Sequence, residues 1–143
     1  MFRLKRNHAR QIIAHARDEA PNECCGILAG KDGQVLELYR AVNAENSPYR
    51  YSIDPGELFR IYTDVESKGW QFLAIYHSHP GSEAYPSRTD IELAQWRGPD
   101  GAAPLWPDVC YLIVSLADPA SPVIRAFHIE EGRVVEDSIL LED

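Results

Sequence analysis

One stretch of the chain, residues 70–77, constrains the fold more than any other. It is apolar at almost every position, with Phe72, Leu73, Ala74 and Ile75 in succession. A strand with one solvated face alternates apolar and polar residues, whereas a run this continuous is typical of a strand covered on both faces. The stretch therefore predicts a central strand in a sheet that has helices on each side.

The remaining pattern supplies elements that suit such a sheet. We expect strands near residues 2–4, 24–30, 34–42, 109–116, 123–129 and 134–141, and helices near 7–20, 54–68 and 87–97. Asn7 is predicted to cap the first helix and Asp54 the second, and residues 98–108 are predicted to form an irregular loop. The order of elements predicts an α/β fold of three layers, with a mixed central β-sheet flanked by helices.

Size and charge exclude several classes of function. The chain has 143 residues, 45% of them hydrophobic, which suits a single domain spanning residues 1–143. Its 14 basic and 22 acidic side chains give a net charge of −8, so nucleic acid is not an expected partner. No apolar run approaches the roughly 20 residues of a membrane span, and no signal peptide is evident, so we expect a cytoplasmic protein without membrane contact.

The three cysteines do not predict a disulfide framework or a thiolate metal site. Cys24 and Cys25 are adjacent, Cys110 is remote, and no C-x-x-C pair occurs. We expect all three to be small buried apolar residues.

The chemistry is concentrated in residues 77–90, whose sequence is HSHPGSEAYPSRTD. Side chains two apart on a strand share a face, so His77 and His79 can project to the same point at the end of the central strand. Pro80 ends that strand, and the following loop can bring Asp90, in the first turn of the next helix, back over it. Two imidazoles and one carboxylate form the ligand set of a hydrolytic zinc site, in which water takes the fourth position.

Hydrolysis of an amide also needs a base, and later an acid for the leaving amine. Glu23 is the best candidate, because it lies between the first helix and a buried strand, where its carboxylate can reach the end of a neighbouring strand. Ser87 could hydrogen-bond the developing oxyanion.

These motifs resemble a known family. The run from Glu23 to Gly30 and the pattern H-x-H-P-x6-S-x2-D resemble the JAMM (MPN+) zinc metallopeptidases, and every motif position is filled. The resemblance covers most of the chain, and Asn43-Ala44-Glu45 with residues 83–90 looks especially like bacterial members that act on ubiquitin-like sulfur carriers.

The resemblance implies a cytidine-deaminase-like (JAMM/MPN) fold and one Zn²⁺ per chain. It implies that His77, His79 and Asp90 are zinc ligands, that Glu23 is the acid and base, and that Ser87 stabilises the tetrahedral intermediate. It also implies a substrate, a ubiquitin-like sulfur-carrier protein with a Gly-Gly tail.

Structural interpretations of the same residues remain open. Ser87 and Asp90 fit an S-x-x-D helix cap, which is compatible with a metal role for Asp90. His77 and His79 could be ordinary histidines, and Glu23 could be a solvated acid. The other three histidines are not part of such a motif, and we expect them at the surface: His8, His15 and His128.

Three functions are compatible with this sequence. The first is a zinc peptidase that cuts after the diglycine of a sulfur carrier and releases cysteine, in cysteine biosynthesis. The second is an isopeptidase that removes ubiquitin-like modifiers from proteins, and the third is a scaffold module of the same fold without catalysis. A zinc nucleoside deaminase would need H-x-E and P-C-x-x-C, and neither occurs. The sequence leaves open the oligomeric state, with a homodimer as one option, and the roles of Cys24, Cys25 and Trp106.

Overall fold

The computed structural model describes residues 1–98 and 101–143. Its elements, in chain order, are β1 (Phe2–Lys5), α1 (Arg6–Glu19), β2 (Cys25–Lys31), β3 (Gln34–Ala41), α2 (Pro55–Ser67), β4 (Gln71–His79), α3 (Arg88–Leu93), β5 (Gln95–Gly98), β6 (Gly101–Pro104), β7 (Cys110–Ser115), β8 (Val123–Glu130), β9 (Arg133–Asp137) and β10 (Ile139–Glu142).

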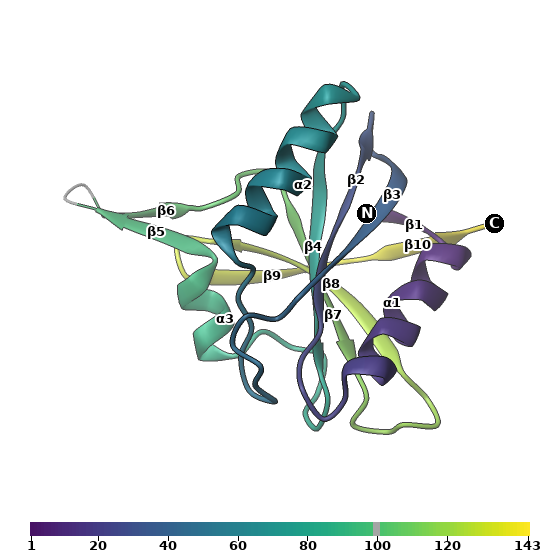
Figure 1. Ribbon diagram of the computed structural model, residues 1–143. Helices are drawn as coiled ribbons and strands as arrows, with labels where there is room; N and C mark the ends of the chain where they lie inside the picture. The colour runs from purple at the N-terminus through teal and green to yellow at the C-terminus, as the bar shows by residue number, and fades with distance from the viewer. Residues whose placement is uncertain (99–100) are drawn as a thin grey trace.

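The main sheet has six strands in the order β3-β2-β4-β7-β8-β9. The apolar strand predicted from residues 70–77 is β4, which lies inside the sheet, antiparallel to β2 and parallel to β7. The sheet is therefore mixed, as predicted. Two small ladders complete the topology: β1 pairs with β10, and β5 pairs with β6 in a hairpin that projects from the body (Figure 1).

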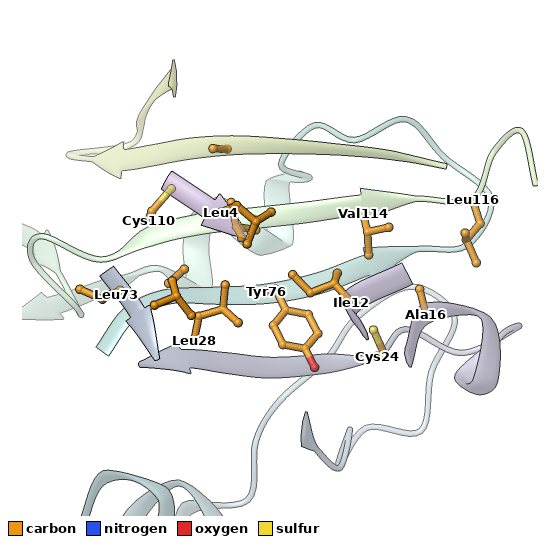
Figure 2. Packing of buried hydrophobic residues seen from close by; sticks show 14 residues of the cluster. Leu4, Ile12, Ala16, Cys24, Leu28, Leu73, Tyr76, Cys110, Val114 and Leu116 are labelled. Atoms are coloured by element: carbon orange, nitrogen blue, oxygen red, sulfur yellow. The ribbon is translucent and has the colours of Figure 1, made fainter. Parts of the chain in front are cut away.

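Helices cover both faces of the sheet, with α1 on one side and α2 and α3 on the other (Figure 1). Each face has its own apolar core. The core beneath α1 includes Ile12 and Ala16 of the helix and Tyr76 of β4 (Figure 2). The opposite core includes Ile61 and Val65 of α2. This arrangement confirms the predicted three-layer α/β fold.

A β-bulge sets which face of β4 carries the histidines. The register of β2 against β4 shifts between Leu28 and Ala29. Beyond the bulge, Ile75 belongs to the core beneath α2, and Tyr76 belongs to the core beneath α1. Because side chains alternate along a strand, His77 and His79 share the α2 face with Ile75.

The predicted helix over residues 87–97 is too long. Helix α3 ends at Leu93, and Gln95–Gly98 forms β5, paired with Gly101–Pro104 of β6. Part of the predicted 98–108 loop is thus a strand, and its backbone groups form hydrogen bonds within the hairpin. Residues 99 and 100 lie outside the described part of the chain.

Two other boundaries differ from prediction. Helix α1 begins at Arg6 with Lys5 at its N-cap and no side-chain cap, so Asn7 lies inside the first turn and does not cap it. The last predicted strand is divided at Ser138, because its carbonyl accepts a hydrogen bond from the Phe2 amide at 2.8 Å. That bond starts the pairing of β10 with β1.

Two histidines predicted at the surface are buried. His8 is 8% exposed and His15 is 2% exposed, and both belong to the face of α1 that packs on the sheet. His15 Nδ1 lies 2.7 Å from the hydroxyl of Tyr76, which gives the imidazole a polar partner inside the core. The Tyr76 ring crosses β2 at Gly26, where an added Cβ would be 2.3 Å from the ring. For His15 the surface prediction failed because a histidine with a buried hydrogen-bond partner packs as a core residue. His8 is buried by the packing of α1 on the sheet, and its Nδ1 has no hydrogen-bond partner among the described residues.

The cysteine prediction is confirmed: Cys24, Cys25 and Cys110 are buried and free. Among the described residues, no helix is both long and apolar enough to cross a membrane.

Candidate metal centre and active site

Three potential ligand atoms converge at the end of β4. Nε2 of His77 lies 3.2 Å from Nε2 of His79, and the two nitrogens lie 3.1 and 3.0 Å from Oδ2 of Asp90. In a tetrahedral zinc site with bonds of about 2.1 Å, neighbouring ligand atoms are about 3.4 Å apart. The three side chains are buried, so the sequence-predicted ligands form one compact group that could hold a metal ion.

Local structure orients two of the three side chains. The Nδ1–H of His79 donates to the carbonyl oxygen of Glu83 at 2.8 Å, which leaves Nε2 with its lone pair toward the group. Asp90 Oδ2 accepts from the Ser87 amide at 2.9 Å, and the Asp90 amide donates to Ser87 Oγ at 3.0 Å. This reciprocal cap at the start of α3 holds the carboxylate over the end of β4.

The group is electrostatically suited to a cation. Burial would raise the pKa of Asp90, but contacts with His77 and His79 outweigh it and hold that pKa well below its usual range. Burial lowers the pKa of His77. The pKa of His79 is raised, because contacts with Asp90 and the Glu83 carbonyl exceed the effect of burial. An ionised carboxylate with imidazole nitrogens is a donor set that zinc prefers.

Glu23 lies beside the group, as the strand register requires. Cys25 of β2 is opposite His77 of β4, and just before β2 the Cys24 carbonyl accepts from the Ser78 amide at 3.1 Å. Continued one residue further, this register brings Glu23 to His79. Glu23 is 3% exposed, and its Oε1 atom has no hydrogen-bond partner in the described structure. Burial raises the pKa of Glu23 to about 8, an effect that nearby His79 moderates. A buried carboxyl with a free oxygen beside a metal group can accept and return a proton.

Ser87 combines two features. Its hydroxyl oxygen accepts the Asp90 amide, which shows that the helix-cap interpretation was correct. The hydroxyl hydrogen is not used in that bond and can donate to another oxygen.

The structure also brings three residues to the site that sequence reasoning missed. Ser78 Oγ accepts from the Cys24 amide at 2.7 Å, which ties the backbone next to Glu23 to β4. Tyr51 stacks on His77, and Asn43 hydrogen-bonds the Glu23 carbonyl at 3.0 Å. Two signals were available in the sequence: the serine between the two ligand histidines and the Asn43-Ala44-Glu45 run. The contact of Tyr51 depends on loop conformation.

An apolar cavity of about 200 Å³ adjoins the metal group. Tyr51 connects the two, since it contacts His77 and also lines the cavity. The wall also includes Leu58 of α2, Ile75 of β4 and Trp106 of the segment before β7. Trp106, whose role the sequence left open, borders this cavity beside the candidate site.

A mixed sheet between helices, with an H-x-H strand end and a helix-borne aspartate, defines a metallopeptidase of the JAMM type. The family model described as "Prokaryotic homologs of the JAB domain" matches residues 5–130, and the chain belongs to this family. The resemblance inferred from the sequence is thereby confirmed.

Named relatives support the same class. The chain is 38% identical over 130 residues to the CysO-cysteine peptidase of Mycobacterium tuberculosis, a match that covers 90% of this chain and 82% of that protein. It is 41% identical over 133 residues to a probable TtuB-protein conjugate cleaving protease of Thermus thermophilus, covering 92% and 78% of the two chains.

Solved structures share the fold. The protein DSY2949 from Desulfitobacterium hafniense superposes with a TM-score of 0.84 at 37% identity, over 100% of this chain and 94% of that one. A JAB1/MPN domain protein from Archaeoglobus fulgidus superposes with a TM-score of 0.56 at 20% identity, over 97% of each chain. The second likeness concerns the fold alone, and together they confirm the predicted fold.

Proposed function

We propose that the protein is a zinc peptidase that hydrolyses the bond after the C-terminal Gly-Gly of a ubiquitin-like carrier protein. The observation that carries this proposal is the buried convergence of His77, His79 and Asp90 with Glu23 beside them. The relatives supply the substrate class, since they are named for CysO-cysteine and TtuB-protein conjugates.

In this proposal, His77, His79 and Asp90 would hold one zinc ion, since their donor atoms suit that metal. When bound, zinc polarises the substrate carbonyl and lowers the pKa of water from about 15.7 to about 7. Glu23 takes the proton from the attacking water and returns it to the leaving amine, which its buried position and free Oε1 allow. Ser87 donates its hydroxyl hydrogen to the oxygen of the carbonyl under attack.

For the leaving group, we propose cysteine carried on a sulfur-carrier protein, which would place the reaction in cysteine biosynthesis. The support is the match to the CysO-cysteine peptidase over 90% of this chain. An isopeptide bond to a protein lysine is the second candidate, favoured by the match to the TtuB-conjugate protease. Both reactions use the same residues and differ only in what leaves.

The third candidate, a scaffold without catalysis, is disfavoured because a potential ligand residue is present at every ligand position. We further propose that residues 1–143 act as one domain in the cytoplasm.

The test compares two substrates. The zinc-loaded chain is incubated with a carrier-cysteine adduct and, separately, with a carrier-lysine isopeptide conjugate, and products are weighed by mass spectrometry. We expect a carrier that ends in Gly-Gly and free cysteine from the first, at a higher rate than cleavage of the second. Faster cleavage of the isopeptide would favour the second candidate, and cleavage of neither would contradict the proposed function.

A further inference from the structure

The two histidines of the metal group are held in different ways. His79 is fixed through Nδ1 by the carbonyl of Glu83 at 2.8 Å. His77 is equally buried, at 1% exposed, but its Nδ1 has no hydrogen-bond partner within the part of the chain that the structure describes. Metal-binding imidazoles usually donate through the second nitrogen, which fixes the plane of the ring. Something else must therefore orient the His77 ring.

An aromatic ring lies flat against it. The centroids of Tyr51 and His77 are 4.5 Å apart, and their planes differ by 23°. This is a stacked contact, in contrast to the edge contact between His77 and His79, which has an angle of 61°. A flat neighbour at this distance opposes rotation of the imidazole out of its plane, because the ring edge would collide with it.

Tyr51 belongs to the segment between β3 and α2, which has little regular structure of its own. Asn43 holds this segment on both sides of the tyrosine. Its amide nitrogen donates to the Arg50 carbonyl at 3.0 Å, and its oxygen accepts from the Ser52 amide at 3.2 Å. The same nitrogen donates to the carbonyl of Glu23 at 3.0 Å. One side chain thus ties the segment that carries Tyr51 to the residue proposed as the base.

We propose that Tyr51 is the positioning residue of His77, and that Asn43 keeps Tyr51 against the imidazole. The inference rests on the proposed metal site. A ring already held in its binding orientation loses less freedom when the metal binds, so the stack strengthens metal affinity. Loss of an outer contact to a metal ligand typically weakens affinity about 10–100-fold.

The test measures metal affinity without catalysis. The metal-free protein is titrated with cobalt(II), and zinc affinity is measured by competition with a chromophoric chelator. We expect Tyr51→Leu to bind zinc about 10–100-fold more weakly, with altered cobalt absorption bands, because the imidazole can tilt. Tyr51→Phe, which keeps the flat ring, should bind like the wild type. Tyr49→Leu is the matched control, since Tyr49 lies in the same segment but is 80% exposed.

A second variant keeps the inference testable if Tyr51→Leu fails to fold. Asn43→Ala leaves the tyrosine in place but removes its support, and we expect zinc affinity to fall in the same direction. Wild-type affinity and cobalt bands in a folded Tyr51→Leu protein would overturn the inference, as would an equal loss in Tyr51→Phe. Failure of the wild-type chain to bind either metal would instead overturn the proposed function.

Discussion

At the scale of single residues, the buried carboxyl of Glu23 is the group whose chemistry is easiest to isolate. We expect Glu23→Gln to keep its fold and its zinc but to lose at least about 100-fold in turnover, because the amide has nearly the same size and cannot take a proton. Zinc is measured by elemental analysis, and turnover by release of the carrier.

The matched control for this variant is Glu19→Gln, at the exposed end of α1, which should behave like the wild type. If Glu23→Gln kept more than about a tenth of wild-type turnover, the expected loss of about 100-fold for a missing general base would not have occurred, and the role assigned to Glu23 would be wrong.

Ser87 poses a different problem, because its hydroxyl caps α3 while its amide donates to the ligand atom of Asp90. Ser87→Ala should lose about 1 kcal/mol of stability with the cap, and about 100-fold or more in turnover with the oxyanion donor. Ser87→Gly should keep most of the stability, since glycine at an N-cap costs only a few tenths of a kcal/mol, but should not recover turnover, because it has no side-chain donor. Thermal unfolding and turnover of both variants are the measurements, and full activity in Ser87→Gly would leave Ser87 with a structural role alone.

At the scale of elements, prediction succeeded where one strand or one short motif carried the information. The apolar run of β4 specified a central strand, and the H-x-H spacing placed both histidines on one face of it. The position of Glu23 near the end of β4 was predicted from its place before a buried strand. These inferences needed only the period of a strand and the direction of the chain.

Prediction failed where a long-range partner decided the structure. The helix predicted over residues 87–97 is replaced by a strand from Gln95 onward, because pairing in a hairpin provides the hydrogen bonds of that backbone. Asn43 and Tyr51 were not found, since their roles depend on how an irregular segment folds back over β4. His15 was placed at the surface because its partner, Tyr76, is 61 residues away.

The contact between α1 and β4 should make the fold sensitive to acid. Burial lowers the pKa of His15 to about 4, below its ordinary value of 6.5, so the folded state favours the neutral ring. The resulting stability is fully present above pH 6.5 and is lost as the pH falls from 6.5 toward 4. We expect a loss of at most about 3 kcal/mol over this window.

His15→Gln provides the comparison, because glutamine can bond the Tyr76 hydroxyl without titrating. Urea unfolding at several pH values should show a shallower decline for the variant between pH 6.5 and 4. Parallel declines in the two proteins would show that another group causes the acid sensitivity.

At the scale of the whole molecule, the site lies on the α2 face of the sheet, next to an apolar cavity lined in part by Trp106. A carrier docked on the protein would extend its tail to the end of β4, where the carbonyl would have to come within attack distance of the water that Glu23 deprotonates. The residues that supply that carbonyl lie close against the site walls, where a side chain would collide. The leaving group departs from the site, and binding energy from the carrier domain holds the tail whatever follows it.

We therefore expect replacement of either tail glycine by alanine to abolish cleavage, and exchange of the leaving cysteine for another amino acid to be tolerated. Product masses from both sets of adducts provide the measurement. Loss of cleavage only when the leaving residue is changed would indicate instead a pocket that recognises that residue.

The most direct test of the central claim is a zinc titration of the metal-free chain, read as cleavage of a diglycine-cysteine carrier adduct. Three buried ligands at one point predict that activity rises linearly with added zinc and reaches a plateau at one equivalent per chain. The His77→Ala plus His79→Ala variant should neither retain zinc nor respond to it. Cleavage by the metal-free chain at the rate of the zinc-loaded one, or undiminished zinc in the double variant, would contradict the account.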